Sequence, residues 1–141
     1  MRTSTPDEMR TSTPEEYPVL VIENDFLKAR LLVAALQTHL GTRQIHVARD
    51  GDQAFQMIRA HDPNVILLNM NLSRPSGVEF LRLLKQNRRE MNGLEIVALT
   101  QQGQGDLRSV ASAMGVRHFV ESPYAPKELS STIVEATRRT E

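Results

Sequence analysis

The sequence contains no cysteine, which excludes disulfide bonds, thiolate catalysis and cysteine-ligated metals from the chain of 141 residues. No apolar run approaches the about 18 residues that a membrane-spanning helix needs, and the polar, proline-containing N-terminus does not resemble a signal peptide. The formal net charge is zero, so no overall field attracts nucleic acid or anionic lipid. We therefore expect a cytoplasmic protein that binds neither nucleic acid nor membranes.

Common motifs for nucleotide and metal binding are also missing. Neither GxGxxG nor GxxxxGK[ST] occurs, so the usual glycine-rich devices for nucleotide binding are excluded. The four histidines, His39, His46, His61 and His118, have no metal-like spacing. We expect them to be surface or half-buried residues.

The first sixteen residues are an octapeptide repeated once, MRTSTPDE followed by MRTSTPEE. The repeat is polar, has no apolar face and is too short for a solenoid unit. It predicts a disordered tail over residues 1–16, with a short partner-binding arm as the less favoured alternative. A folded domain is then expected over residues 17–141.

After this segment, short apolar runs alternate with segments of helical spacing. Strands are expected over residues 18–23, 43–49, 64–69, 94–100 and 116–122. Helices are expected over residues 25–41, 51–61, 76–88, 106–114 and 125–139, with Gly41 as the stop of the first. Strands that are apolar throughout and separated by helices predict a five-stranded parallel sheet covered on both faces, a doubly wound (βα)5 α/β fold.

Individual residues support these helices. Ser76 is a predicted N-cap, and Pro126 suits a first helical turn. In the first helix, apolar residues at helical spacing predict a core-facing stripe of Leu27, Leu31, Leu32, Ala35, Leu36 and Leu40.

Polar residues stand at the carboxyl ends of four predicted strands, the first, third, fourth and fifth. In a doubly wound sheet, ligands bind beyond the carboxyl ends of the strands. The residues expected to meet at this edge are Glu23, Asn24, Asn69, Asn71, Thr100 and Ser122, the last preceding Pro123.

Three short motifs follow one another along the chain: LLNMNLSRPSG, IVALT and FVESPY. From about Val19 to Arg138 the sequence resembles a bacterial response-regulator receiver domain of two-component signalling. It is similar to the small stand-alone receivers that partner bacterial phytochromes and other histidine kinases. The resemblance implies a flavodoxin-like fold with strand order 2-1-3-4-5, and a histidine kinase or another signalling protein as partner.

The resemblance also implies roles for individual positions. The acidic pair that holds magnesium falls on Glu23 and Asn24, and the aspartate that accepts phosphate falls on Asn69. The carbonyl that contacts the metal belongs to Asn71. The residues that contact the phosphoryl group fall on Thr100 and Ser122, with the family's lysine replaced at the latter. The proline of the family pattern falls on Pro123, and its peptide bond is expected to be cis. The aromatic residues of the output switch fall on Phe119 and Tyr124.

The departures from the family pattern concern chemistry. The neutral amide of Asn69 cannot form an acyl phosphate as a carboxylate does. Glu23 is the single carboxylate left, so magnesium binding is expected to be weak or absent and no other cofactor is implied. A lysine at position 122 would lack its carboxylate partners. Asn24, Asn69 and Ser122 are expected to hydrogen-bond to one another or to hold water, and Glu23 to be solvated or locally bonded.

The sequence therefore predicts a pseudo-receiver that is not phosphorylated at Asn69, is not an enzyme and acts through contacts with other proteins. The alternative is a conventional receiver that carries an introduced Asp-to-Asn change. A small doubly wound enzyme is disfavoured because the sheet edge lacks a nucleophile, a base and a metal set. Because the sequence ends just after the last helix, we expect output through the surface of residues 106–140, which is also compatible with homodimerisation.

Overall fold

The computed structural model describes residues 18–40, 44–87 and 93–138, in which five strands alternate with five helices. The strands are β1 (Val19–Ile22), β2 (Ile45–Ala48), β3 (Val65–Asn69), β4 (Glu95–Gln101) and β5 (His118–Ser122). The helices are α2 (Phe26–Leu40), α3 (Gly51–His61), α4 (Gly77–Gln86), α6 (Gly105–Ala113) and α7 (Pro126–Arg138). The predicted order of elements is confirmed. The octapeptide repeat and Gly41 lie outside the described residues.

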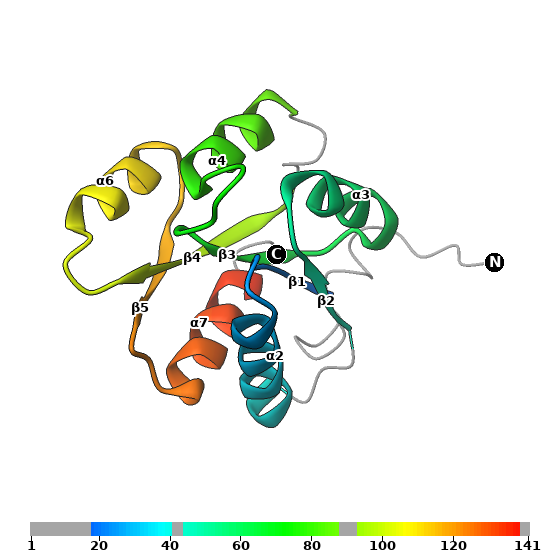
Figure 1. Cartoon of the computed structure of the whole chain (residues 1–141). Coiled ribbons are helices and arrows are strands. Elements are labelled where there is room, and N and C mark those ends of the chain that lie inside the picture. The colour runs from blue at the N-terminus through cyan, green and yellow to red at the C-terminus, as the bar shows by residue number, and fades with distance from the viewer. Residues whose placement is uncertain (1–17, 41–43, 88–92, 139–141) are drawn as a thin grey trace.

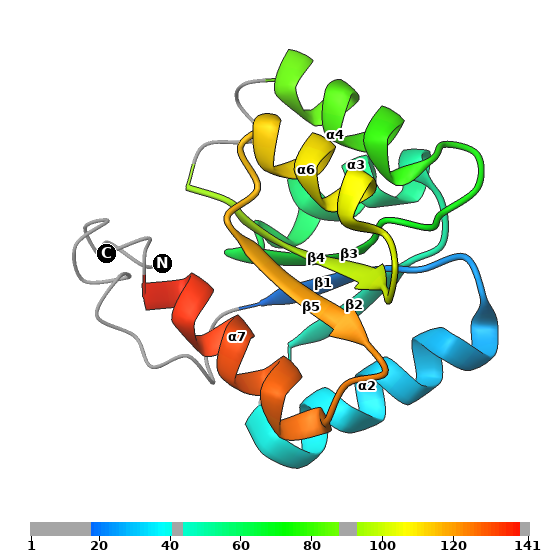
Figure 2. The same ribbon diagram turned by 90° about the vertical axis from the view of Figure 1, so that its left-hand side faces the viewer.

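The strands form one parallel sheet in the order β2-β1-β3-β4-β5, as predicted. Helices α2 and α7 cover one face of this sheet, while α3, α4 and α6 cover the other (Figures 1 and 2). Because every strand runs in the same direction, the carboxyl ends of β1, β3, β4 and β5 reach a common edge. The fold is therefore the doubly wound (βα)5 arrangement that the sequence predicts.

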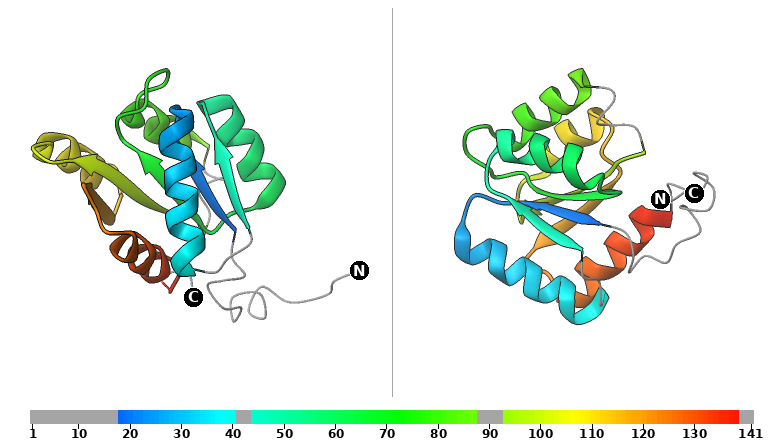
Figure 3. Two further views of the ribbon diagram at one scale, coloured as in Figure 1. Left: turned by 60° about the horizontal axis from the view of Figure 1, so that its bottom comes forward. Right: turned by 90° about the vertical axis from the view of Figure 1, so that its right-hand side faces the viewer.

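Two apolar clusters separate the layers. The side chains of Leu20, Ile22 and Phe80 belong to the cluster under α3, α4 and α6, whereas Val19 and Val21 belong to the cluster under α2 and α7. Figure 3 shows α2 and α7 packed together beneath the sheet. Since both faces of the sheet are covered, β1 and β3 are apolar at nearly every position and show no alternation of polarity.

Short-range hydrogen bonds explain where the helices begin. The Ser76 hydroxyl accepts from the backbone N–H of Glu79, whose carboxylate accepts from the Ser76 N–H, so α4 begins with a capping box. This confirms the predicted N-cap at Ser76. Helix α7 begins at Pro126, where a missing N–H costs nothing.

The prediction of a core-facing stripe in α2 was wrong for two residues. Leu27 and Leu31 are 64% and 60% exposed, while Leu32, Leu36 and Leu40 are buried as predicted. Helix α2 is apolar around much of its circumference, but only one side can face the sheet and α7. Ala29 and the three buried leucines form that side.

The histidine prediction needs one correction. His118 is 8% exposed, because β5 lies in the sheet beside β4, and its Nε2 atom lies 3.8 Å from a carboxylate oxygen of Glu95. His39 is exposed, and half-buried His46 stacks on His61 with ring centroids 3.7 Å apart. Within the described part of the chain, no group of three or more metal-ligating side chains is found, and no helix could span a membrane.

Candidate functional site at the carboxyl ends of the strands

A cavity of about 150 Å³ opens at the carboxyl edge of the sheet. Of the nine positions to which a role was assigned, six line it: Glu23, Asn69, Asn71, Thr100, Ser122 and Tyr124. Asn24, Phe119 and Pro123 are not among its lining residues. The parallel sheet thus brings the ends of four strands to one cavity.

Glu23 is the carboxylate of this cavity. The residue follows β1 directly and is only 3% exposed, and its carboxylate is locally bonded, as one of the two expectations had it. One carboxylate oxygen accepts from the side-chain amide of Asn69 at 2.7 Å, and the other accepts from the backbone N–H of Asp25 at 3.0 Å. Two hydrogen bonds therefore stabilise a buried negative charge.

Asn69 uses both ends of its amide. Its Nδ2 donates to Glu23, and its Oδ1 accepts from the backbone N–H of Asn71 at 2.9 Å. An aspartate could make the second bond but not the first, since a carboxylate has no N–H to donate. The asparagine is thus joined to Glu23 by a bond that only an amide permits.

Asn24 bonds in a different direction. Its Nδ2 donates to the backbone carbonyls of Arg49 at 3.0 Å and Ser73 at 3.2 Å, and its Oδ1 accepts from the Ser73 N–H at 3.0 Å. The amide therefore connects three loops beside the cavity. Of the two expectations for these residues, direct bonding to one another is wrong for Asn24 and Asn69, because neighbouring backbone groups and Glu23 bond to their amides instead.

A pair of amides that joins the cavity residue Asn71 to Gln104 was not foreseen from the sequence. Asn71 Nδ2 donates to Gln104 Oε1 at 3.1 Å, and Gln104 Nε2 donates to Asn71 Oδ1 at 2.7 Å. Gln104 Oε1 also accepts from the backbone N–H of Gln101. The QQGQG segment marks a polar loop, but no spacing rule predicts which of its amides would meet Asn71.

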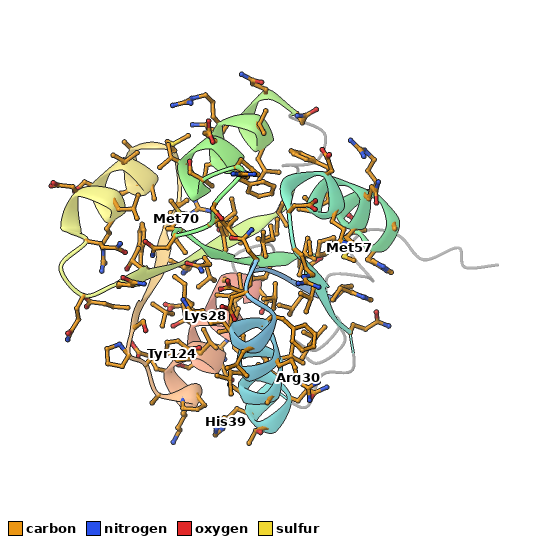
Figure 4. The ribbon with its side chains drawn as sticks, in the orientation of Figure 1. Lys28, Arg30, His39, Met57, Met70 and Tyr124 are labelled. Carbon is orange, nitrogen blue, oxygen red and sulfur yellow. The ribbon has the colours of Figure 1, made fainter. Side chains whose placement is uncertain are left out.

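Lys28 is a second residue that the sequence reasoning missed. It lines the cavity from the first turn of α2, where Asp25 Oδ1 accepts from the Lys28 N–H at 2.9 Å. Figure 4 shows Lys28 and Tyr124 near one another, from α2 and from the segment after β5. A usable signal existed, since a side chain one turn into a helix that follows a strand end can reach back to that edge.

Of the two aromatic residues, Tyr124 lines the cavity and Phe119 does not. Tyr124 is half-buried, and burial, followed by the charge of Glu23, raises the pKa of its phenol above the usual value. Phe119 packs against the α3/α4/α6 cluster, with the Arg108 guanidinium 4.6 Å from its ring centroid. The Ser122–Pro123 peptide bond is cis, as expected.

The family profile of the response regulator receiver domain matches residues 19–134, which is most of the chain. The chain belongs to the response-regulator receiver family. It is 26% identical over 119 residues to a probable chemotaxis protein CheY from Rhizobium etli, a match that covers 84% of this chain and 91% of that protein. It is 25% identical to the phosphate regulon transcriptional regulatory protein PhoB from Pseudomonas aeruginosa, covering 86% of this chain but 52% of that protein. The receiver thus spans about half the length of its PhoB relatives.

Solved structures share the fold. A putative response regulator from Chloroflexus aurantiacus has a TM-score of 0.78 at 21% identity, with 86% of this chain and 98% of that chain covered. The chemotaxis response regulator CheY4 of Vibrio cholerae has a TM-score of 0.70 at 18% identity, with 89% and 99% covered. These structures show the shared fold, and the match to the receiver family shows a domain of two-component signalling.

Proposed function

We propose that this receiver signals without phosphorylation at Asn69 and therefore works as a pseudo-receiver. The observation that carries the proposal is the 2.7 Å hydrogen bond from the Asn69 amide to the Glu23 carboxylate. The bond places an amide donor where the family resemblance implies a nucleophilic carboxylate. An amide at this position has no charge to attack a phosphoryl donor.

The hydrogen bonds of Asn24 favour a natural pseudo-receiver over a receiver with one introduced change. Its Nδ2 group donates to two backbone carbonyls, which an aspartate could not do. Asn24, Asn69 and Ser122 together replace two acids and a lysine of the family pattern. A single introduced Asp-to-Asn change at position 69 would leave the other two unexplained.

Magnesium does not fit the side chains of this cavity well, and we propose that binding is weak or absent. Magnesium is usually bound through one or two carboxylates. Glu23 is the single carboxylate lining the cavity, and each of its oxygens already accepts one hydrogen bond. The Asn69 amide supplies to Glu23 the positive end of a dipole, without a full charge.

Output would then come from a partner that binds one conformation of the domain better than another. We propose that the N-terminal half of α2 contributes to the docking surface for a histidine kinase. Three of its apolar side chains are exposed, Phe26, Leu27 and Leu31, and the last also lines the cavity. The surface of residues 106–140 stays a second proposal for output contacts and for homodimerisation.

The decisive experiment is intact-mass measurement after incubation with acetyl phosphate and magnesium. We expect no phosphoryl gain on the unaltered chain and none on Asn69→Asp, since Asn24 and Ser122 still depart from the working site. A variant that restores all three positions, Asn24→Asp with Asn69→Asp and Ser122→Lys, is the positive control. A phosphoryl gain that peptide mapping places on residue 69 of the unaltered chain would refute the proposal.

The outcome for Asn69→Asp also separates two histories of the site. If Asn69→Asp is phosphorylated as well as the triple variant, Asn69 by itself prevents phosphorylation and the rest of the site is that of a conventional receiver. If only the triple variant is modified, the pocket has changed as a unit.

The docking surface on α2 has its own test. Leu27→Ser together with Leu31→Ser should weaken binding to a histidine kinase that recognises the unaltered chain by at least about tenfold, since two apolar anchors are lost. Leu83→Ser is the matched control, because Leu83 is exposed on α4 on the opposite face of the sheet. Equal losses in both variants would contradict the assignment to α2.

A further inference from the structure

We propose that a groove between helix α2 and strand β2 binds a small amphipathic carboxylate, a molecule with one anionic head and an apolar chain. Among the described residues, none lines both this groove and the cavity at the carboxyl edge of the sheet. Figure 4 shows Arg30, which lines the groove, on the other side of α2 from Lys28 and Tyr124. The inference goes beyond the proposed function and does not depend on the state of Asn69.

The size of the groove suits a small molecule. Its volume of about 470 Å³ lies within the range of about 300–1,000 Å³ that is usual for ligand sites. It follows α2 from Phe26 to Gln37, which places its ends about 16 Å apart along the helix axis. β2 is an edge strand of the sheet, so the groove is reached from the side of the molecule. An extended chain of several carbons therefore fits along the helix.

Most of the lining is apolar. Its apolar members are Phe26, Ala29, Val33, Ala34 and Val47. Phe26 is 60% exposed, so its ring offers apolar surface that a ligand can cover. Removing such surface from water is favourable in proportion to the area buried. The lining therefore calls for an apolar body in the ligand.

Two arginines lie at one end of the groove. The guanidinium carbons of Arg30 and Arg49 lie 5.7 and 5.6 Å from the centroid of the Phe26 ring. Neither guanidinium has a hydrogen bond or ion pair with any residue over 18–40, 44–87 and 93–138. A guanidinium group binds a planar carboxylate through two parallel N–H···O bonds. Since both groups lie over one ring, they can serve the head of one ligand.

The charge of the groove selects an anion. Of the described residues that line it, Arg30 and Arg49 are the charged ones, while the whole chain has a net charge of zero. Gln53 Oε1 accepts from the Arg49 N–H at 2.8 Å, so the Gln53 amide nitrogen faces the ligand as a further donor. The head is therefore placed beside these three residues, and the chain extends along α2 toward Gln37.

Titration of the ¹⁵N-labelled full chain with sodium octanoate, observed by amide NMR, tests the proposal. We expect saturable shifts of the Ala29, Val33 and Val47 signals. Sodium acetate carries the head without the chain, and octanamide carries the chain without the charge. Each should bind at least about tenfold more weakly than octanoate, because each lacks one of the two kinds of contact.

Variants assign the binding to named groups. Arg30→Gln and Arg49→Gln should each weaken octanoate binding by about tenfold or more and leave octanamide binding unchanged, since each removes a partner of the carboxylate. Arg108→Gln is the matched control, because the Arg108 guanidinium also lies over an aromatic ring, that of Phe119, but does not line the groove. Ala34→Phe fills the groove and should weaken the binding of both ligands. The amide spectrum of each variant shows whether the fold is intact.

Two results would overturn the proposal directly. Absence of saturable shifts would show that the groove does not bind an amphipathic carboxylate. Equal affinities for octanoate and octanamide would show apolar contact without recognition of the head.

Two further results would assign the groove to another occupant and overturn the proposal as well. Shifts of the same signals on raising the protein concentration without ligand would indicate a second copy of the chain. Tighter binding of the synthetic peptide MRTSTPEE than of octanoate would indicate the octapeptide repeat of the chain itself. None of these results bears on phosphorylation of Asn69, because no phosphoryl donor is present.

Discussion

The two sides of the cavity differ in how their polar groups are paired. On the side of β1 and β3, both carboxylate oxygens of Glu23 and both amide atoms of Asn69 have protein partners. On the side of β4 and β5, the hydroxyls of Thr100, Ser122 and Tyr124 have none among the described residues. We call these the paired side and the unpaired side.

The two sides therefore differ in how much of their hydrogen-bonding capacity other described residues use. On the paired side, the Asn69 amide and the Asp25 N–H hydrogen-bond to the carboxylate of Glu23. The unpaired side keeps its donors, and Lys28 adds a cation to them.

The largest expected effect tests the backbone behind the paired side. A Cβ at Gly77 would lie 2.7 Å from the Met70 Cα, just after Asn69, so that backbone must shift. We expect Gly77→Ala to lower the free energy of unfolding by about 3 kcal/mol, the upper part of the usual range for overpacking. Urea unfolding measures the change.

Gly105→Ala is the matched control beside the unpaired side. No atom lies within 4 Å of the added Cβ, and Gly105 begins α6. We expect stability to rise by less than about 1 kcal/mol, since the substitution restricts the unfolded chain. An equal decrease in the free energy of unfolding for Gly77→Ala and Gly105→Ala would contradict the expected difference between the two sides.

The next effect concerns the bond between Asn69 and Glu23. Asn69→Asp replaces the 2.7 Å amide bond with two adjacent carboxylates. We expect a loss of about 2 kcal/mol at neutral pH in the presence of a chelator. Magnesium should restore part of it, because two carboxylates can share a cation. Thermal and urea unfolding with and without magnesium measure both effects.

The pH dependence of this variant has a definite sign. Repulsion raises the folded-state pKa of the carboxylate pair above its unfolded value. The deficit should therefore vanish at low pH, where both groups are protonated in both states. It should grow as pH rises through the raised pKa. A deficit that is independent of pH would point to a purely steric cause.

A smaller effect is expected where the two sides meet. Asn71, which follows β3, and Gln104, which precedes α6, form a reciprocal amide pair. A double-mutant cycle of Asn71→Ala and Gln104→Ala should give a coupling energy of about 0.5–1 kcal/mol. A second cycle with Gln102→Ala, an exposed neighbour, should give almost none. Similar coupling energies in both cycles would show that Asn71 and Gln104 do not interact specifically.

The smallest effect is electrostatic. Burial and then the Glu23 charge raise the pKa of Tyr124, so Glu23→Gln should lower that pKa while leaving it above the ordinary value. Phenolate absorbance during a base titration measures the change. Tyr124→Phe leaves Tyr17 as the remaining tyrosine and assigns the signal. An unchanged pKa would show that the charge of Glu23 does not affect the ionisation of Tyr124.

Much of the site position could be predicted from the sequence. The apolar run that ends at Asn69 and the one that ends near Thr100 are strands whose direction is set by their helical crossovers. Parallel strands then bring their ends to one edge. The partners of each side chain could not be predicted, as the amide of Asn24 illustrates: it bonds to Arg49 and Ser73, from loops distant in sequence.

The sequence by itself determined the alternation of strands and helices, the parallel sheet and the presence of an amide in place of a carboxylate at the end of the third strand. These features follow from local periodicity and residue chemistry. The tertiary structure alone decided that Lys28 reaches the cavity, that Gln104 meets Asn71, and that Leu27 and Leu31 face outward. The physical reason is that side-chain direction depends on which face of an element finds a packing partner, and the sequence of that element does not contain the partner.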